Sequence, residues 1–160
     1  MGYNTDFDGA LTVSPPLNKH ERSYLVDFAD TRQTSPDHGP LVVQSRITGF
    51  IDGNDPQGDK PGIWCHWVTD DEGNLVWDEM EKTYDHAEWL EWIILHLLGP
   101  DSRDYVQAHA DDDPRLAHFT CDHTVNGVVD AQGEEPFDLW RIKVETNDVQ
   151  TQYAVIVYPD

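Results

Sequence analysis

The chain has 160 residues, enough for one domain, and its 38% hydrophobic residues suffice for a core. It carries 31 Asp and Glu against 10 Lys and Arg, a formal net charge of −21. Direct binding to nucleic acid or to an anionic membrane is therefore not expected, because both would repel the protein. No apolar run approaches the roughly 20 residues that cross a bilayer, and no signal-peptide pattern opens the sequence. The two cysteines make no disulfide framework. We therefore expect a cytoplasmic protein.

A strand followed by a capped helix is predicted at the start of the sequence. Residues 7–13 alternate apolar and polar and stop before two prolines, which is typical of a strand. Asn18 can cap a helix, and Glu21 completes a capping box, so the apolar residues that follow at helical spacing predict a helix over 19–32. Residues 33–62 are rich in Gly, Pro and Asp and are expected to form a mobile connection with one or two short strands.

A hairpin and a second helix are predicted in the middle of the chain. Residues 62–68 and 74–77 are strand-like and flank a turn-rich loop. Asp85, with a glutamate three residues later, is expected to cap a helix over 86–98, and Gly99 with the next proline is expected to end it. The wide apolar face of this helix is typical of packing on a sheet.

The last third of the chain is expected to form strands joined by turns. The strands are predicted over residues 118–121, 128–131, 139–144 and 153–158. Turn signals lie between them at Asn126-Gly127 and Asn147-Asp148. This element order predicts a single α+β domain over 1–160, a mainly antiparallel sheet with two helices packed on one face.

Several segments resemble parts of an uncharacterised family of small acidic proteins. The matching residues are Met1–Gly9, Pro15–Leu17, Tyr24-Leu25, Phe28–Arg32, Pro61–Val68, Trp77-Asp78, Glu81–Tyr84, Glu88–Trp92 and Asn126–Val129. The family occurs in actinobacteria, other bacteria and their phages, and it has no established activity. The resemblance therefore implies a fold and a genomic setting, including a phage or prophage, but no reaction. The family usually has Gln where this chain has His66.

Acidic residues gather in two local clusters that are candidates for binding. They are Asp70, Asp71 and Glu72, and Asp111, Asp112 and Asp113. One interpretation is a solvated surface, as in a salt-adapted protein. The other is an electrostatic mimic of nucleic acid: a compact chain of this length is roughly 40 Å across, and duplex DNA of that length carries about 23 charges. The net charge of −21 is therefore comparable to the charge of a DNA segment as long as the protein is wide.

Two tryptophans are candidates for an exposed aromatic patch. Trp64 and Trp67 are three residues apart, so on a strand they face opposite sides and cannot both be core residues. Tryptophan is enriched at interface hot spots, so the exposed ring would suit a partner protein. The alternative is that one ring lies under the helix 86–98 and the other is half-buried.

Cysteine and histidine pairs offer a weaker metal hypothesis. Cys65, His66, Cys121 and His123 are zinc-ligand types, but their spacing fits no known zinc module, and neighbours on a strand point apart. The sequence also has no G-x-S-x-G, P-loop, G-x-G-x-x-G, H-E-x-x-H or C-x-x-C motif. Neither a metal nor an organic cofactor is therefore expected.

The sequence thus predicts a non-enzymatic acidic protein that binds a basic protein surface by charge mimicry. Such a surface would belong to a nucleic-acid-handling or defence protein of the host, if the chain is phage-encoded. Two alternatives stay open. One is a small metal-binding protein or enzyme that uses the Cys and His residues, and the other is a protein whose acidity serves solubility alone.

Overall fold

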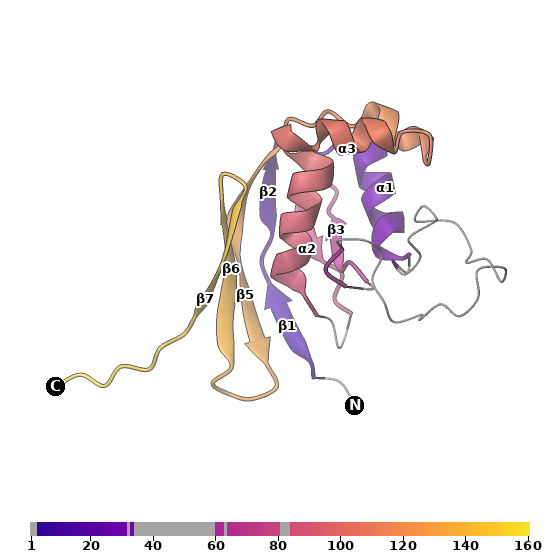
Figure 1. Ribbon diagram of the computed structural model, residues 1–160. Coiled ribbons are helices and arrows are strands. Elements are labelled where there is room, and N and C mark those ends of the chain that lie inside the picture. Colours follow the sequence, from indigo (N-terminus) through magenta and orange to yellow (C-terminus); the bar gives the residue numbers. More distant parts are fainter. Residues whose placement is uncertain (1–2, 32, 34–59, 63, 81–83) are drawn as a thin grey trace.

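The computed structural model describes residues 3–31, 33, 60–62, 64–80 and 84–160 (Figure 1). They form an α+β fold with a seven-stranded sheet in which every pairing is antiparallel, which confirms the predicted fold class. The path through the sheet is β3 (Trp67–Thr69), β4 (Leu75–Trp77), β2 (Leu11–Ser14), β5 (Thr124–Gly133), β6 (Leu139–Glu145) and β7 (Asp148–Tyr153). Strand β1 (Thr5–Asp8) also pairs with β5. No helix in the described part of the chain is long and apolar enough to cross a membrane.

The chain begins with two strands, β1 (Thr5–Asp8) and β2 (Leu11–Ser14), instead of the single strand predicted over 7–13. Gly9 separates them with a φ of 127°, a backbone conformation that favours glycine. Both strands pair with β5 (Thr124–Gly133), β2 along its first half and β1 along its second. The long strand β5 is therefore the centre of the sheet.

The turn predicted at Asn126-Gly127 is wrong, because both residues lie within β5. Gly127 pairs with Leu11 of β2 and has a φ of 144°. A Cβ at this position would lie 3.1 Å from the carbonyl oxygen of Ala10. The glycine allows a close approach of two strands and does not mark a turn.

Helix α1 (Lys19–Ala29) begins with the predicted capping box. Asn18 Oδ1 accepts a hydrogen bond from the backbone N–H of Glu21, and Glu21 Oε1 accepts one from the backbone N–H of Asn18, both at 2.9 Å. The helix ends at Ala29, earlier than predicted. Leu25 and Phe28 are buried and belong to the core.

The predicted hairpin is present with shorter strands, β3 (Trp67–Thr69) and β4 (Leu75–Trp77). Strand β4 pairs with β2 on its other side and so joins the hairpin to the sheet. The mobile connection predicted over 33–62 lies mainly outside the described residues. At its ends, Gln33 and Lys60 are buried, and Lys60 Nζ donates a hydrogen bond to Gln33 Oε1 at 2.6 Å.

The predicted second helix is present as α2 (His86–Ile93), followed by a π-helical turn, η2 (Ile94–Leu98). Its predicted bounds are confirmed, because Asp85 precedes it and Gly99 follows it, but neither residue has the predicted cap geometry. Asp85 has a left-handed φ of 61° and its side chain makes no capping hydrogen bond, whereas an N-cap residue needs extended backbone. Gly99 is extended, with φ −81° and ψ 177°, and lacks the left-handed conformation of a C′ glycine.

Three short helical segments follow that the sequence did not predict: η3 (Pro100–Ser102), α3 (Arg103–Ala108) and η4 (Pro114–His118). The strand predicted over 118–121 is therefore wrong, because the chain is helical up to His118 and Cys121 has a φ of 53°. Helix α3 lies across one end of α1 and α2, which together cover one face of the sheet (Figure 1).

The last two strands form a tight hairpin. Strand β6 (Leu139–Glu145) agrees with its prediction, but the final strand is β7 (Asp148–Tyr153) and not 153–158. Thr146 and Asn147 both have positive φ, 47° and 69°, so a two-residue turn one position earlier than predicted starts the return strand at once. Residues 154–160 therefore extend beyond the sheet (Figure 1).

The two faces of the sheet differ in burial. Val125, Val129 and Ala131 of β5 are buried in the core, whereas Val128 and Asp130 between them are exposed. Alternation of this kind is typical of a sheet with one covered face. The buried face packs against the apolar residues of α1, α2 and η2, which are Tyr24, Leu25, Phe28, Trp89, Leu90, Ile93 and Leu97.

Candidate functional site

Exposed carboxylates dominate the described surface. Each α-helix exposes at least one, for example Asp27 on α1, Glu91 on α2 and Asp104 on α3. Within the described ranges, the exposed lysines and arginines are Lys19, Arg103 and Arg141. The negative charge of the sequence is therefore carried on the outside, with few cations beside it.

The predicted cluster at Asp70, Asp71 and Glu72 is partly a structural element of the β3–β4 turn. Asp70 Oδ1 accepts hydrogen bonds from the backbone N–H groups of Asn74 and Glu72, both at 2.9 Å, and these bonds lower the pKa of Asp70. Its carboxylate thus shapes the turn. Asp71 and Glu72 are exposed and could meet a partner.

The predicted cluster at Asp111, Asp112 and Asp113 is divided in the same way. Asp113 is 4% exposed, and its Oδ2 lies 2.6 Å from Nη2 of Arg115. Arg115 Nη1 also lies 2.6 Å from Oδ2 of Asp27, and the hydrogen bond from Arg115 lowers the pKa of Asp113. Asp113 is therefore buried and holds Arg115, which in turn joins η4 to α1, whereas Asp111 and Asp112 are exposed.

The two candidate tryptophans occupy different environments. Trp67 is fully buried, and its Nε1 donates a hydrogen bond to the carbonyl oxygen of His86 at 2.9 Å, so its place in an exposed patch is wrong. Trp64 is 41% exposed. The aromatic candidate for a partner is therefore Trp64 alone.

Trp64 lines a hollow of about 600 Å³ beside α1. Its described lining residues are Val26, Ala29, Asp30, Trp64, His66, Val68, Asp78 and Met80. His66 Nδ1 lies 2.8 Å from Asp78 Oδ2, and both side chains are partly buried. The hollow thus combines apolar walls with a histidine–aspartate pair and the exposed carboxylate of Asp30.

A second hollow, which we call the acidic groove, lies between the end of α2 and the β6–β7 turn and has a volume of about 270 Å³. Its lining residues are Glu91, Ile94, Leu95, Gly99, Pro100, Asp101, Asn147, Asp148 and Val149. The three exposed carboxylates of Glu91, Asp101 and Asp148 come from three different elements. No lysine or arginine is among the lining residues that the structure describes.

Local structure explains why these elements meet at the groove. Asn147 Oδ1 accepts a hydrogen bond from the backbone N–H of Val125 at 2.6 Å, and its Nδ2 donates to the carbonyl oxygen of His123 at 3.1 Å. These bonds hold the β6–β7 turn against the start of β5. A Cβ on Gly99 would lie 3.4 Å from Nδ2 of Asn147 in the turn and 3.0 Å from the carbonyl oxygen of Ile94, so glycine allows the helix end and the turn to approach.

The four cysteine and histidine candidates do not form one site. Cys65 and Cys121 are buried free thiols, and burial raises the pKa of Cys65 to about 12, away from the thiolate that zinc requires. His66 is paired with Asp78, and both ring nitrogens of His123 lie beside protein oxygens. Among the residues that the structure describes, no three His, Cys, Asp or Glu side chains are arranged to hold a metal ion.

No model of a protein family matches this sequence, no curated protein matches it, and no solved structure matches it. The resemblance of its motifs to a family of small acidic proteins therefore stays an expectation. The geometry and charge of the surface are what point to a function.

Proposed function

We propose that this protein binds a basic protein surface through its exposed carboxylates and is not an enzyme. The observation that carries the proposal is the acidic groove, where Glu91, Asp101 and Asp148 surround an apolar floor. A lysine or arginine side chain has a matching construction, with an apolar stem and a cationic end. Its stem would lie on Ile94 and Val149 while its charge meets the carboxylates.

The hollow at Trp64 supports the same class of partner. Asp30 and Trp64 both line it, and both are exposed. An arginine or lysine can stack on a tryptophan ring and pair with a nearby carboxylate at the same time. Two basic side chains of one partner would then occupy two separate hollows.

Acidic residues beside the groove favour, as the partner, a protein whose basic surface normally binds nucleic acid. Glu88 and Glu91 are one helical turn apart on α2, with Cβ atoms about 5–6 Å from each other. Asp101 and Asp104 continue the negative charge onto η3 and α3. A basic protein that contacts successive phosphates would find a similar density of negative charge here. Binding should therefore be fast, sensitive to salt and competitive with DNA.

The experiment compares two variants that lose the same charge. The groove variant carries Glu91→Gln, Asp101→Asn and Asp148→Asn. The control variant carries Asp6→Asn and Asp8→Asn on β1 and Glu135→Gln, three exposed acids at the opposite end of the sheet. The probe is a fluorescent peptide of ten arginines, followed by anisotropy at about 0.15 M salt, near physiological ionic strength.

We expect the groove variant to bind the peptide about tenfold more weakly than the wild type, and the control variant to lose less than about threefold. Duplex DNA should compete with the protein for the peptide. Equal losses in the two variants would show that the peptide responds to net charge alone. The acidity would then serve solubility, and the proposal would fail.

The alternative of an enzyme or metal-binding protein now depends mainly on His66. This residue lines the hollow at Trp64, whose volume lies in the range of small-molecule sites, and Asp78 fixes the position of its ring. Stoichiometric zinc in the purified protein, or its unfolding by a chelator, would favour this alternative over ours.

A further inference from the structure

In the described part of the chain, the outer edge of β7 is unpartnered, and a run of exposed residues follows it. In the described part of the chain, β7 pairs with β6 on one side only. Residues 154–158, which we call the overhang, continue β7 past the end of β6 and are exposed (Figure 1). The exposed fractions of Val155, Val157 and Tyr158 are 80%, 78% and 85%. These β-branched and aromatic residues favour a strand.

The hydrogen bonds of the hairpin show which backbone groups are free. The backbone N–H of Ala154 donates to the carbonyl oxygen of Leu139 at 3.0 Å. Residue pairs in an antiparallel ladder alternate between hydrogen-bonded and non-hydrogen-bonded. The backbone N–H and C=O groups of the even-numbered residues of β7 therefore point towards β6. The N–H and C=O groups of Val149, Thr151 and Tyr153 therefore point away from the sheet. A strand that continued through the overhang would give the N–H and C=O groups of Val155 and Val157 the same direction.

We infer that β7, extended by the overhang, pairs with the same segment of a second copy of the chain. The two strands run antiparallel and are related by a two-fold axis at Tyr153. The overhang of each copy then lies beside β7 of the other copy. Thr151 then meets Val155, and Val149 meets Val157. All of these residues direct their backbone groups outward, so the register satisfies both strands. The overhang and the paired part of β7, residues 148–152, are equal in length.

The end of the strand agrees with this register. Pro159 has no N–H group and restricts Tyr158 to extended backbone, so pairing cannot run past Tyr158. In the two-fold register Tyr158 lies opposite Asp148, which is the first residue of β7. The paired length is thus limited at both ends by the sequence itself.

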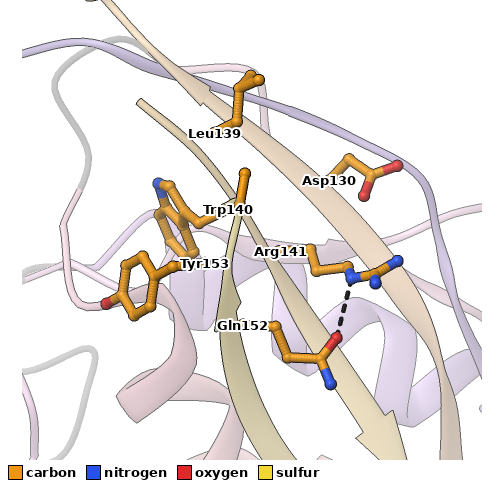
Figure 2. Close-up of a pocket in the computed structure, with 7 residues that line it drawn as sticks. Asp130, Leu139, Trp140, Arg141, Gln152 and Tyr153 are labelled. Atoms are coloured by element: carbon orange, nitrogen blue, oxygen red, sulfur yellow. Dashed lines mark hydrogen bonds between the residues drawn. The ribbon is translucent and has the colours of Figure 1, made fainter. Parts of the chain in front are cut away.

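The side chains on the two faces suit a sheet that continues across the two copies. Figure 2 shows Trp140 and Tyr153 together on one side of the hairpin, with ring centroids 6.4 Å apart, and Arg141 and Gln152 on the other, joined by a 2.9 Å hydrogen bond. On the first side the second copy would add apolar residues to apolar residues. Tyr153 would meet its own counterpart there.

Charge also favours a second copy at this edge over a basic partner. Residues 139–160 contain two cations, Arg141 and Lys143, and three acids, Glu145, Asp148 and Asp160, in a chain of net charge −21. The hairpin and overhang therefore form a nearly neutral, apolar segment of a strongly acidic protein. Two copies can approach there without the repulsion that the rest of the surface would cause.

The first test uses proline at two neighbouring positions. Val155→Pro removes an N–H group that would bond the second copy, whereas Ile156→Pro removes one that points the other way. Sedimentation equilibrium of the full chain at about 0.3 M salt, where repulsion is well screened, measures the dimer. We expect the wild type and Ile156→Pro to dimerise and Val155→Pro to weaken dimerisation at least about tenfold. A monomeric wild type at high concentration, or equal losses in both variants, would overturn the inference.

The second test locates the two-fold axis. In a hydrogen-bonded antiparallel pair the Cα atoms are about 5.5 Å apart, which a disulfide can bridge. Tyr153→Cys should therefore form a disulfide-linked dimer under mild oxidation. Gln150→Cys is the control, because its counterpart would lie six residues away, roughly 20 Å. The native cysteines are buried. Equal cross-linking at the two positions, or none at Tyr153→Cys in a dimer, would contradict the register.

Discussion

His123 and Glu21 form a buried ion pair that joins the start of β5 to helix α1. Their Nε2 and Oε2 atoms are 2.7 Å apart, and the side chains are 1% and 0% exposed. His123 Nδ1 lies 2.6 Å from the carbonyl oxygen of Pro15, so both ring nitrogens face acceptors and the ring must carry two protons to bond both. Burial lowers the pKa of His123, but the hydrogen bond and charge of Glu21 outweigh it, and the pKa is raised.

Removing the imidazole should destabilise the protein strongly. His123→Leu leaves the Glu21 carboxylate buried without its cation, which costs about 3–5 kcal/mol in the free energy of unfolding. Glu21→Gln should cost less, because glutamine still caps α1 and can hydrogen-bond a neutral imidazole. Urea titration of both variants measures these values. A loss below about 1 kcal/mol for His123→Leu would contradict the importance of the pair.

The same pair predicts how stability depends on pH. A raised pKa in the folded state means that His123 contributes its full stabilisation below its ordinary pKa of about 6.5. That contribution is lost as the pH rises through the raised pKa. The difference in unfolding free energy between the wild type and Glu21→Gln should therefore shrink on the alkaline side of pH 6.5. A difference that is constant from pH 5 to pH 9 would show that His123 stays neutral.

His86 should act in the opposite direction on the acidic side. Burial lowers the pKa of His86 to about 4, and its ring lies 4.1 Å from that of Phe7 between centroids. The folded protein therefore holds this histidine neutral, and its contribution to stability is lost as the pH falls from about 6.5 towards 4. His86→Phe should flatten this part of the stability curve, measured by urea titration. An unchanged slope would contradict the assignment.

Trp89 of α2 should stabilise the core and should not contact a partner. This ring is 1% exposed and contacts Phe28 and Trp92. Trp89→Ala should cost about 3–5 kcal/mol in the free energy of unfolding. Glu88→Ala, at the exposed neighbouring position, should change it by less than about 0.5 kcal/mol. Similar small effects at both positions would place Trp89 on the surface.

Salt should stabilise the protein because its exposed charges repel one another. The net charge is −21 and few cations are exposed in the described ranges, so screening by salt reduces the repulsion in the folded state. The melting temperature should rise between about 20 mM and about 500 mM NaCl. A flat or falling curve would mean that neighbouring charges already compensate one another.

Local signals predicted the fold class but not every element. The capping box at Asn18 and Glu21 acts within four residues, so the start of α1 was predictable. Asp85 is a residue type that often caps helices, but its backbone is left-handed. That conformation depends on tertiary packing. The end of the hairpin was placed wrongly because Thr146 shares the positive φ of Asn147, and threonine gives no such signal in a sequence.

The candidate site was less predictable because its residues are distant in the sequence. Runs such as Asp111–Asp113 attract attention, yet Asp113 is used inside the structure by Arg115. The acidic groove instead gathers isolated acids from α2, η3 and β7. Glu91 is one of two acids on α2, and its spacing in the sequence gives no sign that Asp101 and Asp148 lie beside it. The approach of these elements at Gly99 is a tertiary property that no local pattern contains.

Zero-length cross-linking tests most directly whether basic side chains bind at the acidic groove. A carbodiimide joins carboxylates to the amines of a bound peptide of ten lysines, and mass spectrometry of the digested product locates each new amide bond. We predict that the bonds concentrate on Glu91, Asp101 and Asp148 and disappear at about 1 M salt. Bonds spread evenly over the exposed acids, with Asp6, Asp8 and Glu135 labelled as strongly as the groove, would contradict the claim.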